Sequence, residues 1–177
     1  ATAALEAKYG LDKPLFQRYL TYMSDALHGD FGDSLKQRGR TVMSIIQMKF
    51  PVSARVGGIS VLVSLLLGIP LGCIAALKRG KFLDSLISVV ATCGIAVPSF
   101  VICTLLMYTL GVKLRVLPTM GLNGWKNYIM PVIALSFYPT AYIMRLMRSS
   151  MLDVLGQDYM RTAKAKGVVG FWIIFKH

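Results

Sequence analysis

Three long stretches of the chain carry no charged residue. Residues 56–77, 85–112 and 127–144 are uncharged and rich in aliphatic side chains. A helix needs roughly 20 apolar residues to cross the hydrocarbon core of a bilayer. A chain of 177 residues is too short to cover three such helices with its own polar shell. The pattern therefore predicts an all-α, polytopic transmembrane helical bundle with spans at about 56–77, 85–112 and 127–146.

Glycine and proline interrupt the second and third predicted spans. Proline removes an intrahelical hydrogen bond, and the carbonyl that it frees must find a partner in protein or water. Candidates for a pathway through the membrane therefore surround these interruptions: Gly94, Pro98, Ser99, Phe100, Ser136, Tyr138 and Tyr142. Structural kinks and hydroxyls bonded to their own helix explain the same residues equally well. In the first span, Gly57, Gly58, Gly68 and Gly72 are expected at helix contacts rather than in a site.

The segment before the first span, residues 1–55, is polar but patterned. Residues 2–9 are expected to form two helical turns, and Asp12 and Pro14 are start signals for a second helix. That helix carries an apolar stripe suited to packing on the membrane helices: Leu15, Tyr19, Tyr22, Met23 and Leu27. Residues 28–33 read as a turn, and Thr41 is expected to cap a helix that Pro51 ends. The segment is either a docking cap for an external partner or a packed loop.

The tail after the third span, residues 149–177, predicts two short helices. Ser150 begins the first in a capping-box pattern, and Gly156 ends it. Asp158 caps the second, which runs to Lys166, with Gly167 as the left-handed residue that follows. The second helix either sits in a groove of another protein or lies on anionic lipid.

Composition and charge narrow the class of protein. The chain has 20 Lys and Arg against 8 Asp and Glu, a net charge of +12, and 55% hydrophobic residues. Disordered chains are less hydrophobic, and soluble domains are more highly charged. The basic residues concentrate in loop 78–81 and in the tail from Arg145, which predicts that both are cytoplasmic. No catalytic or metal-binding pattern and no ATP-binding loop occurs, so the chain is not expected to be an enzyme.

The tail also carries a family motif. The stretch Asp158-Tyr-Met-Arg-Thr-Ala-Lys-Ala-Lys-Gly167 resembles the cytoplasmic EAA loop of binding-protein-dependent ABC importer permeases. Counting back from Gly167 places Arg161, Thr162 and Ala163 at the Glu-Ala-Ala positions. Further stretches resemble the dipeptide and oligopeptide (peptide/nickel) branch of that family: residues 11–15 with 28–32, residues 94–100, and residues 117–121 with 127–132.

The resemblance implies a six-helix permease subunit of the bacterial or archaeal inner membrane. Its implied partners are a second permease, two cytoplasmic ATPases, an extracytoplasmic peptide-binding protein and membrane lipid, without nucleic acid. ATP and Mg would be held by the ATPases, and no cofactor by this chain. The coupling residues carried over from the motif are Asp158, Tyr159, Arg161, Thr162, Ala163, Lys164, Ala165, Lys166 and Gly167. Residues 1–55 and 111–127 would face the binding protein. Three of six spans are then present, so we expect a fragment.

Two other classes compete with a transport subunit. A secondary carrier or channel fragment would need an ion-coupling carboxylate and no ATPase. A membrane-anchored protein that binds lipid or nucleic acid through its basic tail would lose that binding as salt rises.

Overall fold

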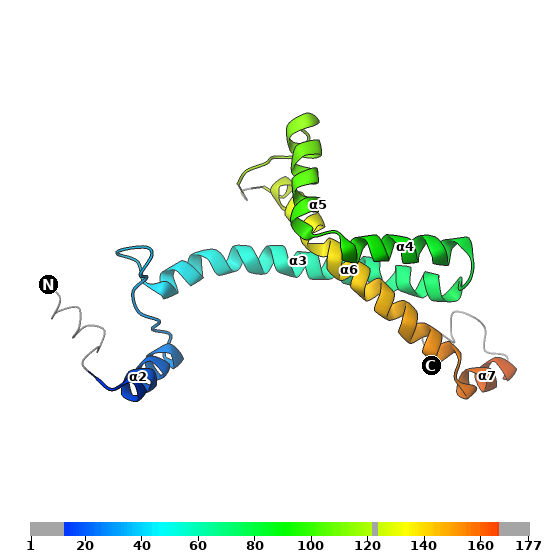
Figure 1. Cartoon of the computed structure of the whole chain (residues 1–177), viewed down its shortest axis with the longest axis horizontal. Coiled ribbons are helices and arrows are strands. Elements are labelled where there is room, and N and C mark those ends of the chain that lie inside the picture. The colour runs from blue at the N-terminus through cyan, green and yellow to red at the C-terminus, as the bar shows by residue number, and fades with distance from the viewer. Residues whose placement is uncertain (1–12, 122–123, 167–177) are drawn as a thin grey trace. The chain divides into compact units, whose positions relative to one another are not determined.

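The computed structural model describes residues 13–121 and 124–166, and its regular elements there are helices (Figure 1). They are α2 (Leu15–Leu27), α3 (Val42–Leu77), α4 (Phe82–Ala96), α5 (Ser99–Leu106), the π-helical η1 (Met107–Lys113), α6 (Lys126–Leu155) and α7 (Asp158–Ala165). The expected all-α class is confirmed. The chain divides into two compact units, Ala1–Ala54 and Arg55–His177. The expectations for residues 2–9, Asp12 and Gly167 lie outside the described residues.

The first unit contains α2 and a tight loop. α2 begins after Pro14, whose carbonyl accepts a hydrogen bond from the Arg18 N–H. The predicted turn at residues 28–33 is confirmed, because Gly29 and Gly32 have positive φ and the Gly32 N–H donates to Asp30 Oδ1. The apolar stripe of α2 is exposed, so its expected packing on the membrane helices stays a prediction.

α3 begins where the sequence predicted but does not end there. Thr41 Oγ1 accepts a hydrogen bond from the Ser44 N–H at 3.2 Å, which caps the helix. The expectation that Pro51 ends the helix is wrong, since α3 continues to Leu77. A proline inside a helix costs about 3 kcal/mol. Cooperative helix formation on both sides, including the long apolar run that follows, offsets that cost.

A row of small residues on α3 packs against α6, which crosses it (Figure 1). Ser64 Oγ lies 2.8 Å from the Ser60 carbonyl in its own helix and 3.2 Å from the Ser136 carbonyl on α6. A Cβ added at Gly72 would lie 2.6 Å from the Met144 carbonyl oxygen. Small residues at every fourth position, here Ser60, Ser64, Gly68 and Gly72, let two helix backbones approach closely. The expected helix contact is confirmed for Gly68 and Gly72; Gly57 and Gly58 face open space instead.

Replacing Gly72 with alanine is expected to destabilise the protein by about 1–3 kcal/mol, because the new methyl group overpacks the α3–α6 contact. Gly57→Ala is the matched control: its methyl group meets nothing within 4 Å, and it adds helix propensity. Thermal unfolding in detergent measures both. Equal melting temperatures for the two variants would contradict the close contact at Gly72.

The second uncharged run forms two helices with a sharp break between them (Figure 1). α4 and the α5–η1 segment are bent by 97° at Val97 and Pro98. Val97 has extended backbone angles because the residue before a proline avoids the helical region. Proline interruption was expected within one span, 85–112; a bend this large was not. α3 and α6 are each long and apolar enough to cross a membrane, and the bent pair adds a third crossing if it is one span.

α6 is continuous from Lys126 to Leu155 and contains both Pro131 and Pro139. The expectation that a new helix begins at Ser150 is wrong. The helix is unbroken before Ser150, so the N–H groups of the residues that follow Ser150 already bond to carbonyls one turn earlier in α6. The predicted end at Gly156 is confirmed, and the Gly156 N–H donates to the Leu152 carbonyl.

Candidate functional site

Asp84 on α4 and Arg148 on α6 form a bidentate ion pair. Arg148 Nε lies 2.6 Å from Asp84 Oδ1, and Arg148 Nη2 lies 2.8 Å from Oδ2. The Asp84 side chain is only 8% exposed, whereas that of Arg148 is 31% exposed. A planar guanidinium meeting a carboxylate in this way restricts orientation as well as distance. The pair therefore holds the first turn of α4 against α6 in a defined geometry.

The Asp84 carboxylate also holds the loop between α3 and α4. Its Oδ2 accepts a hydrogen bond from the Gly80 N–H at 3.0 Å, and Ser88 Oγ donates to Oδ1 at 3.4 Å. Gly80 has φ of +75°, a conformation that glycine adopts without strain. One carboxylate thus connects the loop after α3, the start of α4 and the side of α6. We call Gly80, Asp84 and Arg148 the clasp.

Sequence reasoning did not single out the clasp. In the sequence, Arg148 is one of several basic residues of the tail, and Asp84 belongs to no motif. A signal was nevertheless present: Asp84 is the only acidic residue between Asp33 and Asp153. A single carboxylate beside a basic loop and a long apolar run is expected to be paired, because an unpaired buried charge is costly.

α7 follows α6 after a link of two residues, Gly156 and Gln157. Met160 is 1% exposed and anchors the helix, while Tyr159 is 48% exposed. Thr162 is also exposed and lies on the same helical face as Tyr159, and Lys166 is exposed in the turn directly after the helix. α7 thus has one buried anchor and one face open to a partner.

The residues predicted for the coupling loop fall on or beside α7. Asp158 is its first residue and lies in its first turn, where a negative charge stabilises the helix. The Thr162 hydroxyl donates to the Asp158 carbonyl at 3.2 Å. The backbone of Arg161, Ala163 and Lys164 is helical. Ala165 is exposed and ends the helix, and Gly167 lies outside the described residues.

Three of the predicted pathway residues line one hollow at the α4–α5 break. Pro98 and Ser99 line it from the break, and Tyr138 lines it from α6 beside Pro139. Tyr138 also stacks on Tyr142, with ring centroids 6.5 Å apart. The hollow therefore combines an interrupted backbone with aromatic and hydroxyl groups.

The other pathway candidates lie elsewhere. Gly94 is buried against α6, where an added Cβ would lie 2.7 Å from Ala141 Cβ. Ser136 is buried, and its hydroxyl donates to the Ile133 carbonyl of its own helix. Phe100 is 70% exposed on α5. The structure thus brings Pro98, Ser99 and Tyr138 together and places Gly94 and Ser136 in helix packing.

The described helices from the end of α3 through α7 fall within a known family. Residues 68–177 match the family model described as binding-protein-dependent transport system inner membrane component. The chain belongs to this family. The family resemblance found in the tail is therefore confirmed, as is a multi-pass inner-membrane location. The matched residues of this inner membrane component include the clasp, the α4–α5 break and α7.

Similar proteins include named peptide permeases. The inner membrane component is 42% identical over 173 residues to the dipeptide transport system permease protein DppB of Bacillus subtilis (strain 168), covering 98% of the chain and 56% of that protein. It is 40% identical over 177 residues to the oligopeptide transport system permease protein OppB of Salmonella typhimurium (strain LT2), covering 99% and 58%. The chain thus spans a little more than half the length of these relatives.

Proposed function

We propose that this inner membrane component is part of a permease subunit of an ATP-driven importer for dipeptides or oligopeptides. With a second permease it would form the translocation pathway, and two cytoplasmic ATPases carrying ATP and Mg would drive it. An extracytoplasmic binding protein would deliver the peptide. The observation that carries the proposal is the family match over residues 68–177, which includes a short, partly exposed helix directly after α6. The names of the similar permeases support peptide as the cargo.

α7 is proposed as the coupling helix. Its exposed face, with Tyr159 and Thr162, suits insertion into a groove of an ATPase, and Lys166 follows directly after it. The buried Met160 would keep the helix attached to the permease while that face is engaged. The coupling contact would extend over residues 158–167. The chain itself then performs no bond chemistry and transmits movement.

A mechanical route connects α7 with the proposed pathway. The two-residue link attaches α7 to α6, so a displacement of α7 moves the end of α6. The clasp joins α6 to the first turn of α4, and the other end of α4 leads directly into the break at Val97 and Pro98. Movement that reaches this break would change the hollow beside Tyr138. We propose that this route alternates access between inward-open and outward-open states.

The proposed topology follows from the positions of the basic residues. Loop 78–81 and residues 145–177 would be cytoplasmic, because short cytoplasmic loops are enriched in Lys and Arg. Residues 1–55 and the loop 111–127 would then face the binding protein on the other side. The core between them, residues 56–148, would contain the spans.

Reconstitution tests the proposal. The full-length protein should be purified with its second permease and its ATPases, and placed in liposomes with the binding protein outside and ATP inside. Uptake of a labelled dipeptide and a labelled oligopeptide is expected only with ATP and binding protein present. Uptake driven by a proton or sodium gradient without ATPases would instead indicate a secondary carrier. Binding of the tail to lipid alone, with no association with an ATPase, would also contradict the proposal.

A further inference from the structure

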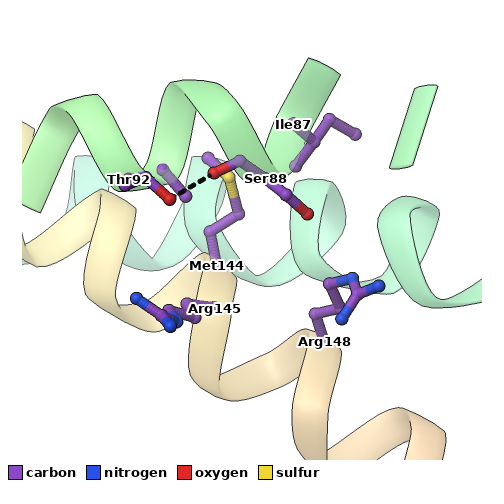
Figure 2. A pocket seen from close by; sticks show the side chains of 7 residues that line it. Ile87, Ser88, Thr92, Met144, Arg145 and Arg148 are labelled. Atoms are coloured by element: carbon purple, nitrogen blue, oxygen red, sulfur yellow. Dashed lines mark hydrogen bonds between the residues drawn. The ribbon is translucent and has the colours of Figure 1, made fainter. Parts of the chain in front are cut away.

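A second recess lies between α4 and α6, separate from the hollow at the break (Figure 2). It has a volume of about 200 Å³ and is lined mainly by Ile87, Ser88, Ala91, Thr92, Met144 and Arg145. Figure 2 shows Met144 projecting from α6 toward Ser88 of α4, between the side chains of Arg145 and Arg148. The recess therefore has two guanidinium groups at its α6 wall.

The two arginines have different partners. Arg148 donates hydrogen bonds from Nε and Nη2 to Asp84, and this carboxylate neutralises the charge of the guanidinium. The Arg145 side chain has no hydrogen bond or ion pair to any residue in the part of the chain that the structure describes. Its side chain is exposed at the rim of the recess. The recess thus carries one positive charge that is not balanced by the described residues.

Apolar side chains lie beneath the recess, whose exposed lining combines polar and apolar groups. Ala91 and Met144 are buried in the packing core between α4 and α6, and Ile87 packs against the same core. At the rim, the Thr92 hydroxyl donates to the Ser88 carbonyl at 2.8 Å (Figure 2), which leaves its oxygen free to accept a hydrogen bond. A molecule that fits the recess would have an anionic end at Arg145 and a short apolar part along the partly exposed Ile87.

The position of Arg145 along α6 indicates the depth of the recess. Arg145 is the first charged residue after the uncharged run 127–144. An apolar stretch of this length spans most of the hydrocarbon core, so its charged end lies near the lipid headgroups. Basic pockets between membrane helices are binding sites for lipid headgroups.

We propose that this recess binds the phosphate of an anionic phospholipid at Arg145, with the start of an acyl chain along Ile87. The positive charge favours an anionic lipid over a zwitterionic one. The partly exposed Ile87 and the position of Arg145 at the end of the uncharged run favour a lipid over a free anion. The proposal rests on the geometry of α4 and α6 and on the position of Arg145 at the end of the uncharged run. It does not depend on the transport function proposed above.

Native mass spectrometry of the full-length complex tests the site. The complex is extracted from membranes of phosphatidylcholine alone or of phosphatidylcholine with phosphatidylglycerol, and the retained lipid is counted. Arg145→Gln is expected to lower retention of phosphatidylglycerol about five-fold, the effect of one basic residue at an anionic lipid surface. Arg145→Lys should retain more lipid than Arg145→Gln. Thr92→Trp, which fills the rim without changing charge, should also lower retention.

Arg79→Gln is the matched control, because it removes an arginine outside the recess. It is expected to retain phosphatidylglycerol as the unmodified protein does. Equal retention by Arg145→Gln and Arg79→Gln would overturn the proposal, provided that both variants keep the unmodified melting temperature. Displacement of the bound lipid by inorganic phosphate would overturn it in favour of a free-anion site. Equal retention of both lipids would show that the charge of Arg145 is not used.

Discussion

On the proposed function, replacing Asp84 with asparagine is expected to lower ATP-driven peptide uptake roughly ten-fold, within the range of allosteric coupling effects. Asparagine has nearly the same shape as aspartate but no charge, and it cannot accept both guanidinium donors of Arg148 as a carboxylate does. α4 would then no longer follow α6 when α7 moves. ATP hydrolysis by the associated ATPases should continue, because α7 is unchanged. The measurement is peptide uptake and ATP hydrolysis in the same proteoliposomes.

Three further variants separate coupling from simple loss of charge. Arg148→Lys keeps the positive charge but removes the bidentate hydrogen bonding to Asp84, so it should also reduce uptake. The exchange Asp84→Arg with Arg148→Asp restores opposite charges and should recover part of the uptake. Asp153→Asn removes an exposed carboxylate from α6, the helix that carries Arg148, and should have little effect on uptake. Normal uptake per ATP in Asp84→Asn would show that the clasp is not part of the transmission route.

Replacing Thr162 with tryptophan is expected to reduce uptake to background. Thr162 is exposed on α7, and on the proposed function its face enters a groove of an ATPase. A bulky ring would prevent α7 from seating, because well-packed interfaces do not absorb an added side chain of this size. The ATPases should be lost during purification of the complex, while the permease still inserts into the membrane. Co-purification and uptake measure the two effects.

Thr162→Ser is the matched control for this variant. Serine is smaller than threonine and keeps the hydroxyl that donates to the Asp158 carbonyl. Its uptake should remain close to that of the unmodified protein. Retention of the ATPases by Thr162→Trp, together with normal uptake, would exclude this face of α7 as the contact. The result would leave the family assignment unchanged, because that rests on residues 68–177.

The positions of the long helices were predictable because lipid imposes a simple requirement. A segment that crosses the hydrocarbon core must be apolar and helical, so uncharged runs mark α3 and α6. Their ends were less predictable. α3 begins at Val42, well before its uncharged run, and α6 continues to Leu155. Local signals at Pro51 and Ser150 were overridden because a helix already formed on both sides propagates cooperatively.

The clasp could not be derived from local patterns. Asp84 and Arg148 are 64 residues apart, and their pairing depends on how α4 packs against α6. The pathway candidates posed a related problem, since small and hydroxyl residues serve both close helix packing and open cavities. Gly94 and Ser136 lie in packing contacts, whereas Ser99 and Tyr138 line a hollow. Only the tertiary arrangement separates these two groups.

The break at Val97 and Pro98 lies between two native thiols. Cys93 is on α4 and Cys103 is on α5, and both are exposed free cysteines. Once Cys73 and any cysteine elsewhere in the full-length protein are replaced, spin labels on Cys93 and Cys103 report the distance across this break. A change in the angle between α4 and α5 would change the distance between the labels, whereas a joint rotation of both helices would leave it constant. The chain therefore already carries the attachment points needed to tell bending from rigid tilting during turnover.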